Sequence, residues 1–103
     1  MITNKTNKTN LTELNKLEEY LRKNGYNFER FDQDGDDLHA ERHQLIVYDD
    51  DGKRRWDAIC NWGSYGHAAG LIEVMGDIAE SAPSRVIGWL TADKIIERLE
   101  VEP

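Results

Sequence analysis

The turn from Gly63 to His67 is the segment of this sequence whose residue types come nearest to a ligand site. Four glycines lie between residues 61 and 77, and the turn Gly63-Ser64-Tyr65-Gly66-His67 precedes an apolar run expected to be helical. Backbone N–H groups at a helix start can hold an anion. The turn lacks the Lys-Ser/Thr pair of a Walker sequence and the spacing of a dinucleotide fingerprint. We therefore expect a tight turn capped by Ser64, with a nucleotide or phosphate site as the alternative.

A second group of reactive residue types comprises two histidines and the single cysteine. His43 and Cys60 are expected to be cross-strand neighbours, and His67 follows soon after. Three such side chains could bind zinc, but the paired-cysteine spacing of most zinc sites is missing. A lone cysteine on an apolar face behaves as a small hydrophobic residue. We therefore expect core packing here, and no metal and no cofactor.

Acidic residues recur between Asp32 and Asp37 in a pattern that superficially resembles a calcium loop. In an EF-hand counted from Asp32, the sharp-turn glycine would fall at Asp37 and the bidentate glutamate at His43. The register excludes an EF-hand, so a solvated acidic loop is expected. No acid can be assigned to a cleft beside another acid, and no nucleophile has an orienting partner. The sequence therefore predicts a protein that is not an enzyme.

Three helices and a central hairpin are expected to position these residues. Leucines at spacings of three and four predict a helix at about 11–24, and Thr91 is expected to cap a last helix at about 91–100. Apolar residues at Ala68, Leu71, Ile72, Met75 and Ile78 predict a further helix at about 66–79. Its glycines would permit close packing on a sheet.

The clearest predicted element is a hairpin at about 43–62. Two β-prone runs flank Asp51-Gly52, taken as a two-residue loop, which places Val47 opposite Trp56 and Asp49 opposite Arg54. Aromatic residues at 26–34 predict another strand, and the run around 85–89 is β-like. The expected fold is α+β: one small domain over residues 11–103, an antiparallel meander with helices on one face, and a disordered lead-in at 1–10.

The charge balance bears on the class of partner. The 103 residues carry 13 basic and 20 acidic side chains, a net charge of −7. A body of this sign repels phosphate backbones, so direct nucleic-acid binding is not expected. The basic run Lys53-Arg54-Arg55 follows three aspartates and is expected to pair with them across the turn. A lone cysteine, no apolar run of membrane length and no signal peptide predict a cytoplasmic protein.

The stretch HQLIVYDDDGKRRWDAICNWGSYGHAAGLIEVMGDI, followed by GWLTADKIIERLE, resembles small uncharacterised proteins encoded by phages and prophages of Gram-positive bacteria. The resemblance covers roughly residues 42 to 100 and brings no catalytic residue with it. It implies that the chain occupies a host or defence protein, as anti-CRISPR inhibitors do when they present carboxylates where a nuclease expects phosphates.

The favoured hypothesis is therefore a non-enzymatic accessory protein that binds and inhibits or modulates a host or defence protein with a basic surface. Acidic groups of the 32–37 loop and the hairpin tip would carry the contact, with two exposed aromatic residues beside them. The candidate partner-binding residues are Asp32, Asp34, Asp36, Asp37, Tyr48, Asp49, Asp50, Asp51 and Trp62. The oligomeric state stays open, a homodimer included.

Overall fold

The first helix, α1 (Thr12–Lys23), forms where the leucine spacing predicts it. The computed structural model describes residues 9–80, 82 and 84–101 of the chain. Asn10 Oδ1 accepts the Thr12 N–H at 3.0 Å at the start of the helix. At its end, Gly25 takes a φ of +72° and the Tyr26 N–H donates to the Leu21 carbonyl at 3.0 Å. A polar side chain at the start and a glycine at the end therefore define this helix, and both can be recognised in the sequence.

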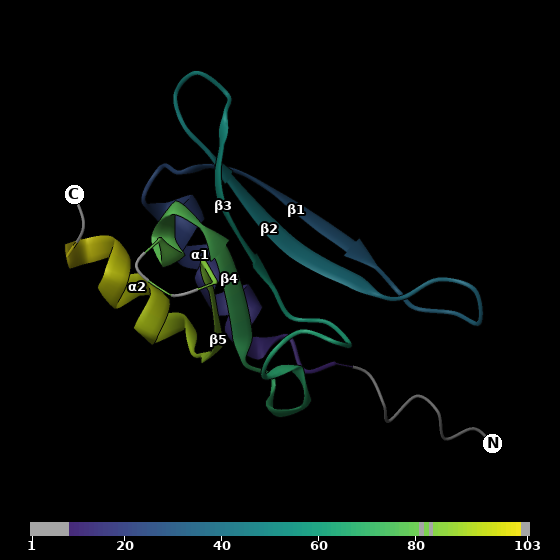
Figure 1. The fold of residues 1–103 in the computed structure, drawn as a ribbon. Helices are drawn as coiled ribbons and strands as arrows, with labels where there is room; N and C mark the ends of the chain where they lie inside the picture. The colour runs from purple at the N-terminus through teal and green to yellow at the C-terminus, as the bar shows by residue number, and fades with distance from the viewer. Residues whose placement is uncertain (1–8, 81, 83, 102–103) are drawn as a thin grey trace.

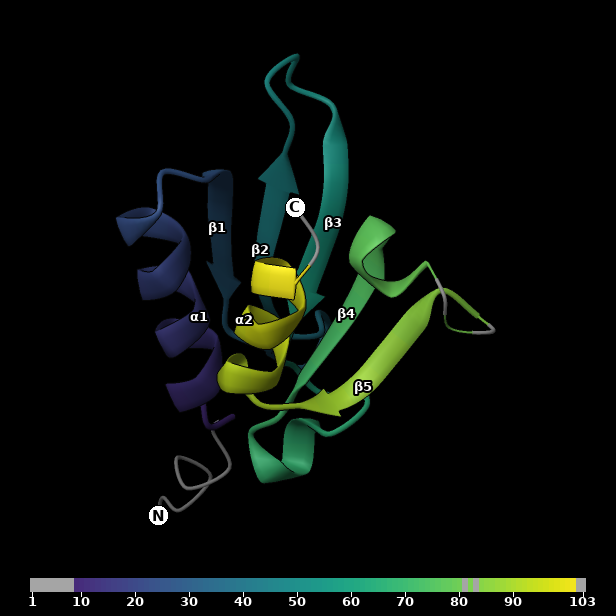
Figure 2. The same ribbon diagram turned by 90° about the vertical axis from the view of Figure 1, so that its left-hand side faces the viewer.

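Five strands form one sheet in the order β1-β2-β3-β4-β5, and every neighbouring pair is antiparallel. The strands are β1 (Asn27–Gln33), β2 (Arg42–Tyr48), β3 (Arg54–Ile59), β4 (Ile72–Gly76) and β5 (Val86–Leu90). Figures 1 and 2 show α1 and the last helix, α2 (Ala92–Val101), together on one face of this sheet. The predicted α+β meander is confirmed.

A side chain of α1 connects the two helices by a hydrogen bond to the backbone at the start of α2. Glu13 of α1 accepts the Ala92 backbone N–H at 2.7 Å, and Thr91 Oγ1 accepts the Lys94 N–H at 3.2 Å. Thr91 thus caps α2 as predicted. The carboxylate of Glu13 satisfies a second N–H group at the positive end of the α2 dipole. This contact fixes how α2 begins relative to α1.

The central hairpin has the predicted core register but a different turn. Val47 lies opposite Trp56, whereas Tyr48 lies opposite Arg54, so β3 carries one extra residue. The Asp49 N–H donates to the Lys53 carbonyl at 2.8 Å, and Gly52 has a φ of +82°. This is a three-residue loop with a bulge rather than the predicted two-residue loop. The expected cross-turn pair is also replaced, because Arg54 pairs with Asp57 and Arg55 pairs with Asp77.

The helix predicted at 66–79 is wrong, because this segment forms strand β4 between two short 3₁₀ turns. The turns are η2 (His67–Ala69) and η3 (Asp77–Ala79). Gly70, shortly before β4, and Gly76, the last residue of β4, have φ values of +73° and +115°, which interrupt helical geometry. Within β4, Ile72 and Val74 are buried beside the core of the sheet. The described residues therefore contain two α-helices rather than three.

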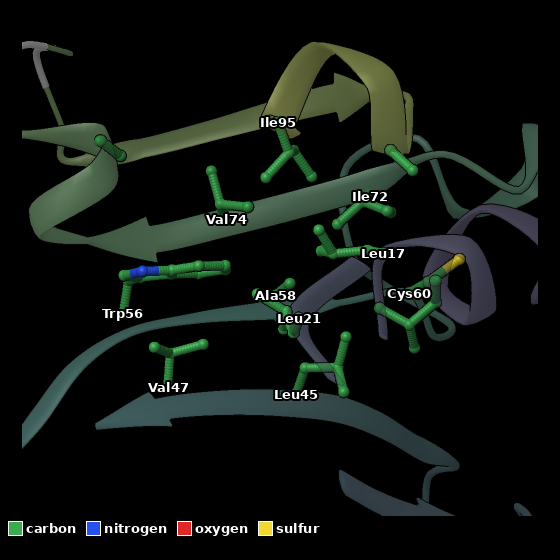
Figure 3. Packing of buried hydrophobic residues seen from close by; sticks show 13 residues of the cluster. Leu17, Leu21, Leu45, Val47, Trp56, Ala58, Cys60, Ile72, Val74 and Ile95 are labelled. Carbon is green, nitrogen blue, oxygen red and sulfur yellow. The ribbon is translucent and has the colours of Figure 1, made fainter. Parts of the chain in front are cut away.

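The core fills the space between the sheet and the two helices. Figure 3 shows Trp56 of β3 between Val47 of β2 and Val74 of β4, with Leu17 and Leu21 of α1 nearby. Burial of large apolar side chains from five elements is the main favourable contribution to the stability of this fold. The buried cluster comprises Leu14, Leu17, Leu21, Leu45, Val47, Trp56, Ala58, Cys60, Ile72, Val74, Ala79, Ala92 and Ile95.

The expected lead-in at 1–10 is described only at its end, since residues 1–8 lie outside the described residues. Thr9 donates its hydroxyl to Glu41 at 2.5 Å, and the Asn10 carbonyl accepts the Cys60 thiol at 3.7 Å. These two residues therefore contact the domain. Neither α1 nor α2, the helices of the described chain, is long and apolar enough to cross a membrane.

Candidate docking surface

The two acidic segments lie at opposite ends of β2. The 32–37 segment precedes the strand and the 49–51 tip follows it, and Figure 1 shows the two connections far apart. Seven residues of strand span about 20 Å. The predicted partner-binding residues therefore form two groups. Asp32, Asp34, Asp36, Asp37 and Trp62 lie at one end, and Tyr48, Asp49, Asp50 and Asp51 lie at the other.

At the hairpin tip, Asp49 is engaged within the turn, whereas the side chains of Asp50 and Asp51 make no hydrogen bond or ion pair with a described residue. Asp49 Oδ1 accepts the N–H groups of Asp51 and Lys53, both at 2.9 Å. Tyr48 donates its hydroxyl to Glu29 at 2.5 Å, and this hydrogen bond is the main reason that the Tyr48 pKa is raised. Lys53, Arg54 and Arg55 follow directly, so the tip carries both signs of charge.

The other end, which we call the acidic loop (residues 32–41), carries an excess of negative charge. Asp36 accepts the N–H groups of Leu38 and His39, and these backbone hydrogen bonds lower its pKa. Asp34 and Asp37 are exposed, and neither side chain makes a hydrogen bond or ion pair with any described residue. Their charges are therefore available to a cationic partner.

A buried histidine fastens the acidic loop to the sheet. The side chain of His43 is only 8 % exposed; its Nδ1 lies 2.8 Å from Asp32 Oδ1, and its Nε2 lies 3.4 Å from Glu41 Oε1. Burial opposes the charge of Asp32, but hydrogen bonds from His43 and Arg30 outweigh burial and lower the pKa. His43 thus has two carboxylate neighbours, which the sequence analysis did not foresee because Glu41 lies before the strand.

Glu41 connects the acidic loop to the segment that carries Trp62. Its Oε2 accepts the Trp62 backbone N–H at 2.6 Å and the Thr9 hydroxyl at 2.5 Å. Burial opposes the charge, but these bonds and the neighbouring His43 outweigh it and lower the Glu41 pKa. Sequence reasoning missed this residue. The one feature of the sequence that could have pointed to Glu41 is its place directly before the predicted strand.

Cys60 is not placed for nucleophilic or metal chemistry. The thiol is buried, and burial together with the nearby charge of Glu41 raises its pKa to about 11. It is therefore protonated at neutral pH and lacks the thiolate that a nucleophile requires. Within the described residues, no group of three or more His, Cys, Asp or Glu side chains could hold a metal ion.

The turn at 63–67 is built as a tight loop whose polar groups bind one another. Ser64 Oγ donates to the Asn61 carbonyl at 2.8 Å and accepts the Asn61 N–H at 3.1 Å. The Tyr65 N–H donates to the buried Glu73 carboxylate at 2.8 Å. A carboxylate thus occupies the place of an anionic ligand, and no α-helix follows to add a dipole. The geometry does not favour the phosphate or nucleotide alternative.

Three large aromatic side chains surround this loop and are mostly exposed. Trp62 is 73 %, Tyr65 62 % and Trp89 65 % exposed, and we call them the aromatic patch. The Trp89 N–H donates to the Tyr65 carbonyl at 3.2 Å, and the Trp62 ring lies 6.5 Å from that of His67. Of these three aromatic residues, the sequence analysis assigned only Trp62 to partner binding. Pairing of β4 with β5 brings Trp89 to the loop, which no local pattern reveals.

Comparison of the chain with protein-family models, with curated proteins and with solved structures gives no match in any of the three. The resemblance to small phage and prophage proteins therefore remains a prediction.

Proposed function

We propose that this protein is a binding module that docks the acidic loop on a basic surface of another protein, and acts by occupying that surface rather than by catalysis. The observation that carries the proposal is the pair of exposed carboxylates on Asp34 and Asp37, which no described side chain neutralises. An exposed aromatic side chain suits the centre of a protein interface, and carboxylates suit its rim.

The partner fitted to such a surface is a protein whose groove binds nucleic-acid phosphates. The net charge of −7 gives long-range attraction to a basic groove and repulsion from DNA itself. In keeping with the phage resemblance, we propose a host or defence protein as the target. Occupying its phosphate-binding groove would inhibit or modulate it.

The two acidic ends provide a matched pair of variants for testing this function. Immobilised protein is incubated with bacterial lysate at low salt, and bound proteins are displaced by NaCl or by duplex DNA and identified by mass spectrometry. We expect the double variant Asp34→Lys with Asp37→Lys to lose the captured partner. The double variant Asp50→Lys with Asp51→Lys makes the same charge change at the other end and should retain it.

Three outcomes would contradict the proposal: no protein is captured, the captured protein resists both NaCl and duplex DNA, or the two double variants behave alike. Circular dichroism spectra of both variants establish that a lost contact does not reflect a lost fold.

A further inference from the structure

The aromatic patch exposes more apolar ring surface than the fold requires. Each of Trp62, Tyr65 and Trp89 is more than three-fifths exposed, and two of the three are tryptophans, the residue type most enriched at interface hot spots. Scattered exposed apolar residues need no explanation, but three aromatic side chains around one loop indicate a contact surface.

The backbone under the patch is held in an unusual conformation. Ile72 lies opposite Leu90 and Val74 lies opposite Ile87, so Glu73 faces two residues of β5. This irregularity in pairing includes Trp89, which has a φ of +61°. A bulky residue in the left-handed region is an outlier that must be held by its surroundings, and bulges commonly redirect a side chain. Here they hold the backbone that carries an exposed indole.

Tyr65 is held equally firmly from below. A Cβ atom at Gly88 would lie 2.3 Å from the Cβ of Tyr65, so Tyr65 occupies the space above that glycine. Its N–H and carbonyl are both bonded, to Glu73 and to Trp89 respectively. The backbone of two aromatic anchors is therefore ordered before any partner arrives, which reduces the entropy lost on binding.

The charges beside the patch identify the chemistry of its partner. Glu41 bonds the backbone of Trp62, and His43 links Glu41 to Asp32, so the base of the acidic loop adjoins the patch at Trp62. Exposed indole faces beside carboxylates are best matched by a partner side chain that is a cation with a flat face. Arginine meets both conditions, because its guanidinium stacks on aromatic rings and forms paired hydrogen bonds with carboxylates.

We propose that the aromatic patch binds arginine side chains on the surface of the partner protein, while the acidic loop supplies the attraction of opposite charge. This inference rests on the proposed function and adds a preference to it: arginine rather than lysine. A compact ammonium group satisfies the carboxylates equally well but gains less from stacking on an indole.

The test compares an oligo-arginine peptide with an oligo-lysine peptide of equal length by isothermal titration calorimetry at low salt. Indole fluorescence is recorded in parallel to show that the exposed tryptophans sense the peptide. We expect oligo-arginine to bind roughly three- to tenfold more tightly than oligo-lysine. Trp62→Ala and Trp89→Gly should each reduce this ratio towards one. Glycine is chosen at Trp89 because it tolerates the positive φ.

Leu38→Ala is the matched control, because Leu38 is an apolar side chain of the acidic loop that is 87 % exposed and has no aromatic face. It should leave the arginine preference unchanged. Equal affinity for the two peptides, or an undiminished preference in both tryptophan variants, would overturn the inference. If both peptides still bind in a salt-dependent way that Asp34→Lys with Asp37→Lys abolishes, the proposed function survives that failure. If neither peptide binds at low salt, both proposals fail.

Discussion

At the scale of single residues, the notable feature is a histidine held between two carboxylates at the base of an acidic loop. Asp32 and Glu41 face opposite nitrogens of the buried His43 ring, and Arg30 also bonds Asp32. An isolated carboxylate in this half-buried position would be disfavoured by desolvation. Hydrogen bonds reverse that effect here, so the charged forms of both acids belong to the folded state.

This arrangement predicts that acid destabilises the protein. The pKa values of Asp32, Asp36 and Glu41 are lowered by folding, so their contribution to stability is complete above the ordinary carboxyl pKa. It is lost as the pH falls through the lowered values, because protonation then favours the unfolded chain. Urea titrations across the acid range should show a declining free energy of unfolding.

Variants at these positions separate this effect from general acid denaturation. Asp32→Asn and Glu41→Gln should each lower stability at neutral pH and make the decline with acid shallower. Leu38→Ala, which removes no titratable group, should follow the wild-type profile. Parallel profiles for all four proteins would contradict a role for the carboxylates around His43.

The strained backbone at Trp89 gives a second prediction at this scale. Trp89→Gly and Trp89→Ala remove the same exposed indole, but only glycine suits the φ of +61°. We expect the glycine variant to be more stable than the alanine variant by about 1 kcal/mol. Thermal unfolding followed by calorimetry measures the difference. An alanine variant of equal or greater stability would show that the strain is absent.

At the scale of elements, β4 shows how a short apolar run can satisfy two periodicities. Residues 66–79 carry apolar side chains at helical spacing, yet Ile72 and Val74 also alternate with Glu73 and Met75 as a strand requires. Periodicity alone does not separate these in a run this short. Gly70 and Gly76 were the available signals, since both mark points where the chain leaves helical geometry.

Gly76 is expected to be the glycine least tolerant of substitution among those around β4. Its φ is +115°, and an added Cβ would lie 2.5 Å from the Arg55 carbonyl oxygen and 2.7 Å from Trp56 Cα. Gly76→Ala should therefore cost more than about 2 kcal/mol, because strain and overlap with backbone combine. Denaturant unfolding measures the loss.

Gly25→Ala is the control for that substitution. Gly25 also has a positive φ, of +72°, but an added Cβ there would meet nothing within 4 Å. We expect a cost of about 1 kcal/mol from the conformation alone. Similar costs at the two positions would mean that β3 moves away from β4 readily.

At the scale of the whole molecule, strand β2 separates two segments that differ in charge, the hairpin tip and the acidic loop. The hairpin tip mixes aspartates with Lys53 and two arginines, whereas the acidic loop carries Asp34 and Asp37 with no basic residue beside them and is joined to Trp62 at its base through Glu41. Most of the ion pairs are exposed on at least one side, so they contribute little to stability. Repulsion among the excess carboxylates acts against this small gain.

We therefore expect NaCl to stabilise the protein. Screening weakens the repulsion of a chain with net charge −7 more than it weakens its exposed ion pairs. The gain in the free energy of unfolding should be on the order of 1 kcal/mol between low and moderate salt. Chloride is preferred to sulfate, because sulfate also strengthens apolar burial. A melting temperature that falls as NaCl is added would show that the ion pairs dominate.

The sequence by itself determined both α-helices, the hairpin with Val47 opposite Trp56, and the α+β class. These depend on local signals: leucine spacing, the Thr91 cap, and alternation around a turn containing Gly52. The sequence also determined the net charge of −7, because composition is independent of fold.

Only the tertiary structure decided that residues 72–76 join the sheet, since pairing with β3 and β5 outweighs their helical spacing. The same pairing brought Trp89 to the 63–67 loop, and β2 separated the two acidic segments. Contacts between residues distant in the chain depend on strand order and register, which local periodicity does not contain.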